Sequence, residues 1–358
     1  MSRPVPSAAV LAAVMVVAAV AVAVAELAIP GGGRGALLVT LVLWTAIAQG
    51  SVAAVAAAEY TGARWVEQVR GELLAPARML PLLLVLFVFL WPQLDLYPWA
   101  AAPGAWLNRP FFAGRNVALL AAAALLASLF AARAERRDPS ARRFAVAYLV
   151  VYAASQSLVA FDWVMSLAYP WVSSMFGLYF MVEALYAGVA LAGVLFLLLG
   201  RPPREAGGAR WEAAGRDAGL LLFGFSVLWG GLFFAQFLLI WYGNLPEEVS
   251  LVAARLAGRA TRPLVPAFIA LCWGVPFFLL ISAWAKRSAL AVGIASGSVL
   301  LGLAAERLMF MLPALPLRFG VLALENALLV AVWLVLSLRR RSPAGQAAAR
   351  ASGGGPRS

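Results

Sequence analysis

Long uncharged apolar segments recur along the whole chain, and they restrict its possible folds more than any other feature. The sequence is 64% hydrophobic and only 12% charged over 358 residues. A run of about 17 to 25 apolar residues can cross the hydrocarbon core of a bilayer as a helix. Because backbone polar groups in lipid must be satisfied within their own segment, we expect an all-α, polytopic integral membrane protein.

About ten segments reach this length. They are predicted at 8–27, 35–58, 77–96, 115–134, 143–165, 175–199, 218–241, 264–284, 290–312 and 319–338. The first could alternatively be a secretory signal peptide, although its apolar run is long for one. We predict that 1–338 form a single transmembrane domain and that 339–358 form a basic, disordered cytoplasmic tail.

The distribution of positive charge predicts the orientation. Most of the 28 lysines and arginines lie at the N-terminus, in the loops after the second, fourth, sixth and eighth segments, and in the C-terminal tail. The positive-inside rule therefore places both termini in the cytoplasm. The formal net charge of +12 then reflects topology and contact with membrane lipid, and no nucleic acid is expected as a partner.

The chain has no histidine and one cysteine, Cys272. Haem held by two histidines, iron–sulfur clusters held by cysteines, and zinc or copper held by imidazole or thiolate need ligands that this sequence lacks. We therefore expect that this chain binds no metal or redox centre of its own.

A few charged residues fall within the apolar segments, where each costs at least about 2.5 kcal/mol on insertion scales. The candidates for handling a quinone or protons are Asp162, Glu183, Glu306, Arg307 and Glu325. A rise of about 1.5 Å per residue places them in the outer third of the membrane, together with Glu26, whereas Glu59 lies on the cytoplasmic side. Because Glu306 and Arg307 point about 100° apart on a helix, we expect each to pair with a different helix.

Three interpretations of these residues remain open, and the plainest is that their side chains only snorkel to the membrane interface. The second is an interhelical ion-pair network around Arg307 that only fastens helices together. The third is a quinol-headgroup site or an outer proton half-channel, since both need titratable groups at that depth.

The stretch "FFAQFLLIWYGNLPEE" at 233–248 predicts a helix that reaches the outer interface and ends in a turn at 243–246. An aromatic belt followed by a solvated acidic loop accounts for its composition. The alternative is a docking turn for a partner on the outer side. The residues of this candidate turn are Gln236, Trp241, Tyr242, Asn244, Glu247 and Glu248.

Three spaced motifs resemble a known family. They are "LYPW" at 96–99 with "WLNRPFFAGRN" at 106–116, "FDWVMSL…PWVSSMFGLYF" at 161–180, and the stretch at 233–248. Together they resemble the second quinone-binding-type membrane subunit of bacterial alternative complex III, a quinol:cytochrome c oxidoreductase, which is related to the polysulfide-reductase membrane subunits. The likeness covers about 96–313.

The resemblance implies a ten-helix subunit of the bacterial inner membrane with two four-helix bundles plus peripheral helices. It implies quinone or quinol as a ligand, and haem and iron–sulfur clusters in partner subunits. Those partners would be a multihaem cytochrome, an iron–sulfur subunit and a paralogous membrane subunit. The family's His-Trp-x-Asp pattern is replaced here by Leu303-Ala304-Ala305-Glu306, and the Glu306–Arg307 pair is similar to that of the paralogous, quinol-oxidising subunit.

Two other functions are compatible with such a sequence. A secondary transporter or permease would also use buried carboxylates, but it should have broken helices at corresponding positions of two halves. Pro81, Pro92, Pro266 and Pro276 give no clear pairing of that kind. A polytopic glycosyltransferase would need acidic or histidine-bearing outer loops, which the sequence hardly offers.

Overall fold

The computed structural model describes residues 8–28, 35–200, 202 and 207–338, and these parts are helical without any strand. The continuous membrane-length helices are α1 (Ala8–Ala28), α2 (Ala36–Thr61), α5 (Arg109–Glu135), α7 (Phe176–Leu199), α8 (Gly208–Gly243), α12 (Ala289–Met311) and α13 (Phe319–Leu338). The prediction of an all-α, polytopic membrane protein is confirmed. The predicted tail at 339–358 lies outside the described residues.

Two further membrane-length helices are composite. The first spans Arg70–Val88 and joins α3 (Arg70–Leu74), η1 (Ala75–Arg78) and α4 (Leu80–Val88). The second spans Ala141–Ala168 and joins α6 (Ala141–Leu158), η4 (Val159–Val164) and η5 (Met165–Ala168). With these two, nine helices in the described residues are long and apolar enough to cross a membrane.

The remaining predicted segment forms a shorter apolar helix, Leu264–Leu280, interrupted in its middle. It consists of α10 (Leu264–Ile269), the π-helical turn η7 (Ala270–Gly274) and α11 (Val275–Leu280). Pro276 has no N–H to donate to the carbonyl of Cys272, four residues earlier. The hydroxyl of Tyr186 on α7 donates to that carbonyl instead, at 2.9 Å. The interruption is therefore stabilised by a neighbouring helix.

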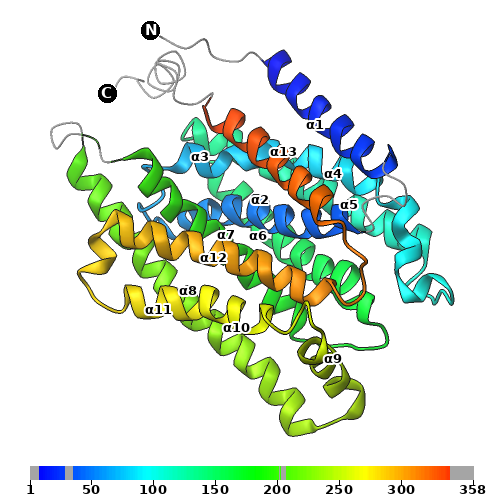
Figure 1. The fold of residues 1–358 in the computed structure, drawn as a ribbon. Coiled ribbons are helices and arrows are strands. Elements are labelled where there is room, and N and C mark those ends of the chain that lie inside the picture. The colour runs from blue at the N-terminus through cyan, green and yellow to red at the C-terminus, as the bar shows by residue number, and fades with distance from the viewer. Residues whose placement is uncertain (1–7, 29–34, 201, 203–206, 339–358) are drawn as a thin grey trace.

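The helices pack as two four-helix groups with two peripheral helices (Figure 1). The first bundle contains α2, α3 with α4, α5 and α6, and the second contains α7, α8, α10 with α11, and α12. α1 and α13 pack against each other, α13 also packs on α2, and α1 on α4. In Figure 1 the pair lies along the upper edge of the molecule and α8 along the lower edge.

The two bundles meet where α2 crosses α7, and glycines allow the two backbones to touch. A Cβ at Gly50 would lie 1.6 Å from the carbonyl oxygen of Ala184, and one at Gly188 would lie 2.2 Å from that of Gly50. No larger residue fits at either position without moving a backbone. Small residues at helix crossings are the usual means of close packing in membranes.

Several predicted boundaries were wrong. The third span begins at Arg70 and ends at Val88, because residues predicted to complete it form the separate 3₁₀ turn η2 (Trp91–Leu96). A second short turn, η3 (Pro98–Ala100), follows before α5. Helix α8 begins ten residues earlier than predicted, since its charged first turns continue the apolar helix on one side of the membrane.

The solvated acidic loop predicted after Pro246 is instead an amphipathic helix, α9 (Pro246–Ala257). Asn244 ends α8 in the left-handed conformation, with φ 45°, and Pro246 occupies the first turn of α9, where its missing N–H costs nothing. Arg255 ties α9 to the second bundle by donating to the carbonyl of Phe310, at 3.0 Å. Burial lowers the pKa of Arg255 to about 10, so this guanidinium stays charged at neutral pH.

Candidate functional site

The candidate charged residues lie toward one end of the helices, and the structure separates them into three clusters. This end, called the outer end below, is where α1 and α12 finish and α2, α7 and α13 begin. The positive-inside rule predicts that it faces away from the cytoplasm. The clusters are the Arg307 triad in the second bundle, the Asp162 clamp in the first, and the Glu325 cluster between α13, α1 and α2.

The Arg307 triad joins α12 to α7 inside the second bundle. Arg307 donates from Nη2 to Glu183 at 2.6 Å and from Nη1 to Glu306 at 3.3 Å, and all three side chains are at most 1% exposed. The indole of Trp229 on α8 donates to Glu183 at 2.9 Å, and Tyr179 on α7 donates to Glu306. The expectation that Glu306 and Arg307 pair with different helices was wrong, because both side chains reach α7.

The triad contains two carboxyl groups and one guanidinium. Arg307 also lies over the ring of Phe180, with its Cζ 4.0 Å from the ring centroid. Its Nε–H finds no hydrogen-bond acceptor among the described residues. An excess negative charge without contact to water is very costly in a membrane interior. One additional proton makes the triad neutral, and Glu306 is the better place for it because Glu183 holds the shorter ion pair.

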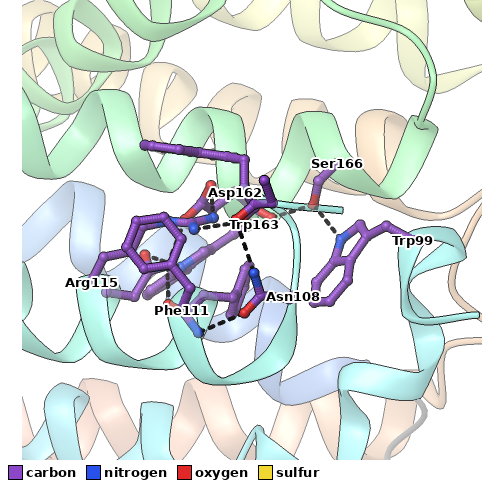
Figure 2. Close-up of polar contacts among 11 residues, drawn as sticks. Trp99, Asn108, Phe111, Arg115, Asp162, Trp163 and Ser166 are labelled. Carbon is purple, nitrogen blue, oxygen red and sulfur yellow. Dashed lines mark hydrogen bonds and ion pairs between the residues drawn. The ribbon is translucent and has the colours of Figure 1, made fainter. Parts of the chain in front are cut away.

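The Asp162 clamp fastens the outer ends of α5 and α6, as Figure 2 shows. Arg115 binds Asp162 through two nitrogens, at 2.7 and 2.8 Å. Asn116 donates to the same carboxylate at 2.7 Å and accepts from the indole of Trp163 at 2.8 Å. Arg115 also lies 4.3 Å from the ring centroid of Trp106. Because both oxygens of Asp162 are already occupied, this geometry favours a structural role.

The first two motifs converge on this clamp. Tyr97 donates to the carbonyl of Trp163 at 3.1 Å, and the indole of Trp99 donates to Ser166 at 3.2 Å. Asn108 caps the start of α5 by accepting from the N–H of Phe111 at 3.0 Å (Figure 2). Residues from 96–99, 106–116 and 161–167 are therefore one hydrogen-bonded unit, which gives a physical reason for their occurring together.

The Glu325 cluster lies between three helices near the outer end. Glu325 on α13 is fully buried and accepts from the hydroxyl of Thr40 on α2 at 2.7 Å. Asn326 donates to the same hydroxyl at 3.2 Å. Glu26 on α1, which is 7% exposed, accepts from Gln93 in η2 at 2.7 Å. Two carboxyl groups thus lie where α1 and α13 pack against each other, beside the first turns of α2.

The predicted docking turn is spread along the end of α8 and the start of α9. Ser173 donates to Gln236 at 2.8 Å, so Gln236 joins α8 to the loop before α7. Trp241 and Tyr242 are 65% and 85% exposed, and Asn244 is the left-handed cap. Glu248 is half-buried in the first turn of α9, whereas the side chain of Glu247 lies outside the described part. A docking role for these residues stays a prediction.

Sequence reasoning missed the neutral and cationic partners of the predicted acids. They are Tyr179, Trp229, Arg115, Asn116, Thr40, Asn326 and Gln93. One signal was available for Tyr179, because it precedes Glu183 by four residues and so shares a helix face with it. Asn326 follows Glu325 on α13 and reaches it through the shared hydroxyl of Thr40. The others lie on different elements from their acids, and only the packing brings them together.

Comparison with known proteins leaves the resemblance of the motifs untested. Searches against protein-family models and against curated proteins returned no match.

Proposed function

We propose that this chain is an integral membrane subunit of a quinol-oxidising respiratory complex of the quinol:cytochrome c oxidoreductase type. It holds no redox centre of its own, anchors subunits that carry haem and iron–sulfur clusters, and handles protons or quinone at the outer end. The proposed location is a bacterial inner membrane with both termini in the cytoplasm. The proposed partners are a multihaem cytochrome, an iron–sulfur subunit and a paralogous membrane subunit.

The Arg307 triad is the observation that carries this proposal. A guanidinium that only fastened two helices would need one carboxylate, but Arg307 holds both Glu183 and Glu306. The second carboxyl group makes the cluster a place where a proton can be gained or lost beside a cation, since Glu306 lies 3.3 Å from Arg307 in either state of the proton. Intramembrane ionisable groups of this kind are typical of proton relays and of substrate pathways.

The overall architecture is compatible with the same function. The resemblance implies two four-helix bundles with peripheral helices, and the packing of α2 to α12 with α1 and α13 outside them has that form. The motifs that carry the resemblance all gather at the outer end, where a partner on that side would dock. Trp241 and Tyr242 are exposed there, on the last turn of α8.

The test begins with purification of the tagged protein from its native membranes, followed by a haem stain and a quinol:cytochrome c assay. We expect haem-bearing partners and quinol-dependent reduction of cytochrome c. Glu306→Gln should lower turnover by about tenfold or more, as loss of a proton-transfer group does, while leaving subunit assembly unchanged. Glu67→Gln, at an exposed carboxyl far from the triad, is the matched control.

Two results would reject the proposal. A protein that purifies alone, without haem-bearing partners, is not a subunit of such a complex. If Glu306→Gln abolishes assembly, the triad serves structure and the proton-handling role is withdrawn.

A second candidate function, secondary transport, is favoured by one observation. Helix interruptions occur at η1 in the third membrane helix and at η7 in the eighth, which are equivalent positions if the chain consists of two five-helix halves. Broken helices at equivalent positions mark binding sites in many transporters. Uptake of substrate or ions by proteoliposomes that contain only this chain would support transport over the respiratory role.

A further inference from the structure

The Glu325 cluster orients its hydroxyl and amide groups so that one carboxyl oxygen is left for a proton. Thr40 has one hydroxyl hydrogen, and Asn326 already donates to its oxygen at 3.2 Å. The hydrogen of Thr40 is therefore directed to Glu325 Oε2, at 2.7 Å. Asn326 is itself fixed, because its own oxygen accepts from the indole of Trp44 at 2.9 Å. The other oxygen, Glu325 Oε1, is buried and receives no hydrogen bond in the described part of the chain.

Glu26 is held in the opposite way, as an acceptor at both of its oxygens. The backbone N–H of Leu37 donates to Oε1 at 3.2 Å, and Gln93 donates to Oε2 at 2.7 Å. Hydrogen bonds from N–H groups favour the ionised form of a carboxyl group. Glu26 and Glu325 meet the first turns of α2 three residues apart, at Leu37 and Thr40, on two helices that pack against each other. A proton on one of two neighbouring carboxyl groups removes the repulsion between them.

The charged groups around Glu325 support placing the proton on Glu325 and the negative charge on Glu26. Of the elements packed against α13, α1 contributes Glu26, α2 contributes Glu59 at its far end, and η1 contributes Arg78, which pairs with Glu135. Of these, Glu26 lies nearest, since it and Glu325 contact neighbouring residues of α2, Leu37 and Thr40. Among the described residues, Glu325 forms no ion pair with a lysine or arginine, in contrast to the acids of the triad and the clamp.

We propose that Glu325 and Glu26 form a proton-binding carboxyl pair, in which Glu325 carries an exchangeable proton and Glu26 is its anionic partner. Gln93 links the pair to the outer end, since it is half-buried in η2 and next to the exposed Trp91. A proton from the outer aqueous side would pass to Glu26 when Gln93 moves, and then to Glu325. This inference names a second protonation site, and it relies on the proposed function only for the use made of the proton.

The side of α1 that carries Glu26 offers access to an apolar reagent. Ala23 and Leu27 on α1 line a groove that faces Val85 and Phe89 on the neighbouring helix. Dicyclohexylcarbodiimide is an apolar molecule that adds covalently to the protonated form of a carboxyl group. It therefore reports whether a carboxyl group within the membrane holds a proton.

The experiment labels the full-length protein in its native membranes with dicyclohexylcarbodiimide over a series from mildly acidic to alkaline pH. The protein is then purified, and the modified residue is located by mass spectrometry. We expect label on Glu325, with the extent of labelling decreasing as pH rises. Glu325→Gln should lose the label, and Glu26→Gln should move the labelling profile to lower pH because a neighbouring negative charge is removed.

Controls separate this proposal from misfolding and from the proposed function. Thr40→Val removes the hydroxyl that donates to Oε2 of Glu325, so it should change the pH profile of labelling while Glu325 itself is kept. Glu67→Gln should leave that profile unchanged. The wild-type labelling needs no variant, so a poorly folded Glu325→Gln protein does not block the test. Label on Glu183 or Glu306 in place of Glu325, or label on Glu325 that is independent of pH, would overturn the proposal. If the label on Glu325 depends on pH but the protein has no quinol activity, the proposed function is rejected and the carboxyl pair stands.

Discussion

Replacing Arg307 with glutamine should destabilise the second bundle more than any other single change in the triad. The substitution leaves Glu183 and Glu306 buried without their cation, and each is fully shielded from solvent. Removing one partner of a buried ion pair typically costs about 3 to 5 kcal/mol. Glu306→Gln should cost only about 1 kcal/mol, because Arg307 keeps its shorter pair with Glu183 and a neutral amide replaces a carboxyl group that already carries a proton.

The single cysteine provides the assay. Cys272 is fully buried between the two helices that the triad joins, with its carbonyl bound by Tyr186 on α7 and its thiol 3.9 Å from the carbonyl of Val299 on α12. A thiol-reactive dye can reach it only when the bundle opens. When reclosing is fast, the labelling rate follows the opening equilibrium, in which about 1.4 kcal/mol corresponds to a factor of ten.

Arg307→Gln should therefore accelerate labelling of Cys272 by about a hundredfold or more, and Glu306→Gln by less than about tenfold. Arg259→Gln, at an exposed arginine, is the control and should have no effect. Equal acceleration by Arg307→Gln and Glu306→Gln would show that both carboxylates are needed as anions, and the argument for an extra proton would fail. No acceleration by Arg307→Gln would show that the ion pairs contribute nothing to the stability of the bundle.

Two further predictions concern the packing of the helices. Gly188→Ala should lower the free energy of unfolding of the purified protein by about 1 to 3 kcal/mol, because its Cβ would lie 2.2 Å from the carbonyl oxygen of Gly50. Gly224→Ala is the control, since a Cβ there meets nothing within 4 Å. Equal stability of the two variants in thermal unfolding would contradict the close crossing. Arg255→Ala should release α9 from α12 and so speed limited proteolysis between α8 and α10, whereas Arg259→Ala should not. Unchanged cleavage of the Arg255→Ala variant would show that the hydrogen bond to Phe310 does not hold α9 in place.

The helices themselves could be predicted from the sequence, because their apolar length is a local property and lipid imposes helical hydrogen bonding on any such segment. The turn at 243–246 was predictable for the same reason, since glycine, asparagine and proline end and restart helices locally. Boundaries near η2 and at the start of α8 were not, because polar residues can either leave a helix or continue it outside the membrane.

The sequence by itself determined that this chain is a helical membrane protein, that it lacks histidine and paired cysteines, and which acids lie within its apolar segments. Only the tertiary structure decided which acids share a site. Asp162, Glu183 and Glu325 all lie toward the outer ends of their helices. Asp162 is held by Arg115 and Glu183 by Arg307, whereas Glu325 accepts a hydrogen bond from the hydroxyl of Thr40. The role of a charged group within a membrane helix depends on the group that it pairs with. That partner lies on another helix, whose position depends on the packing of the whole chain.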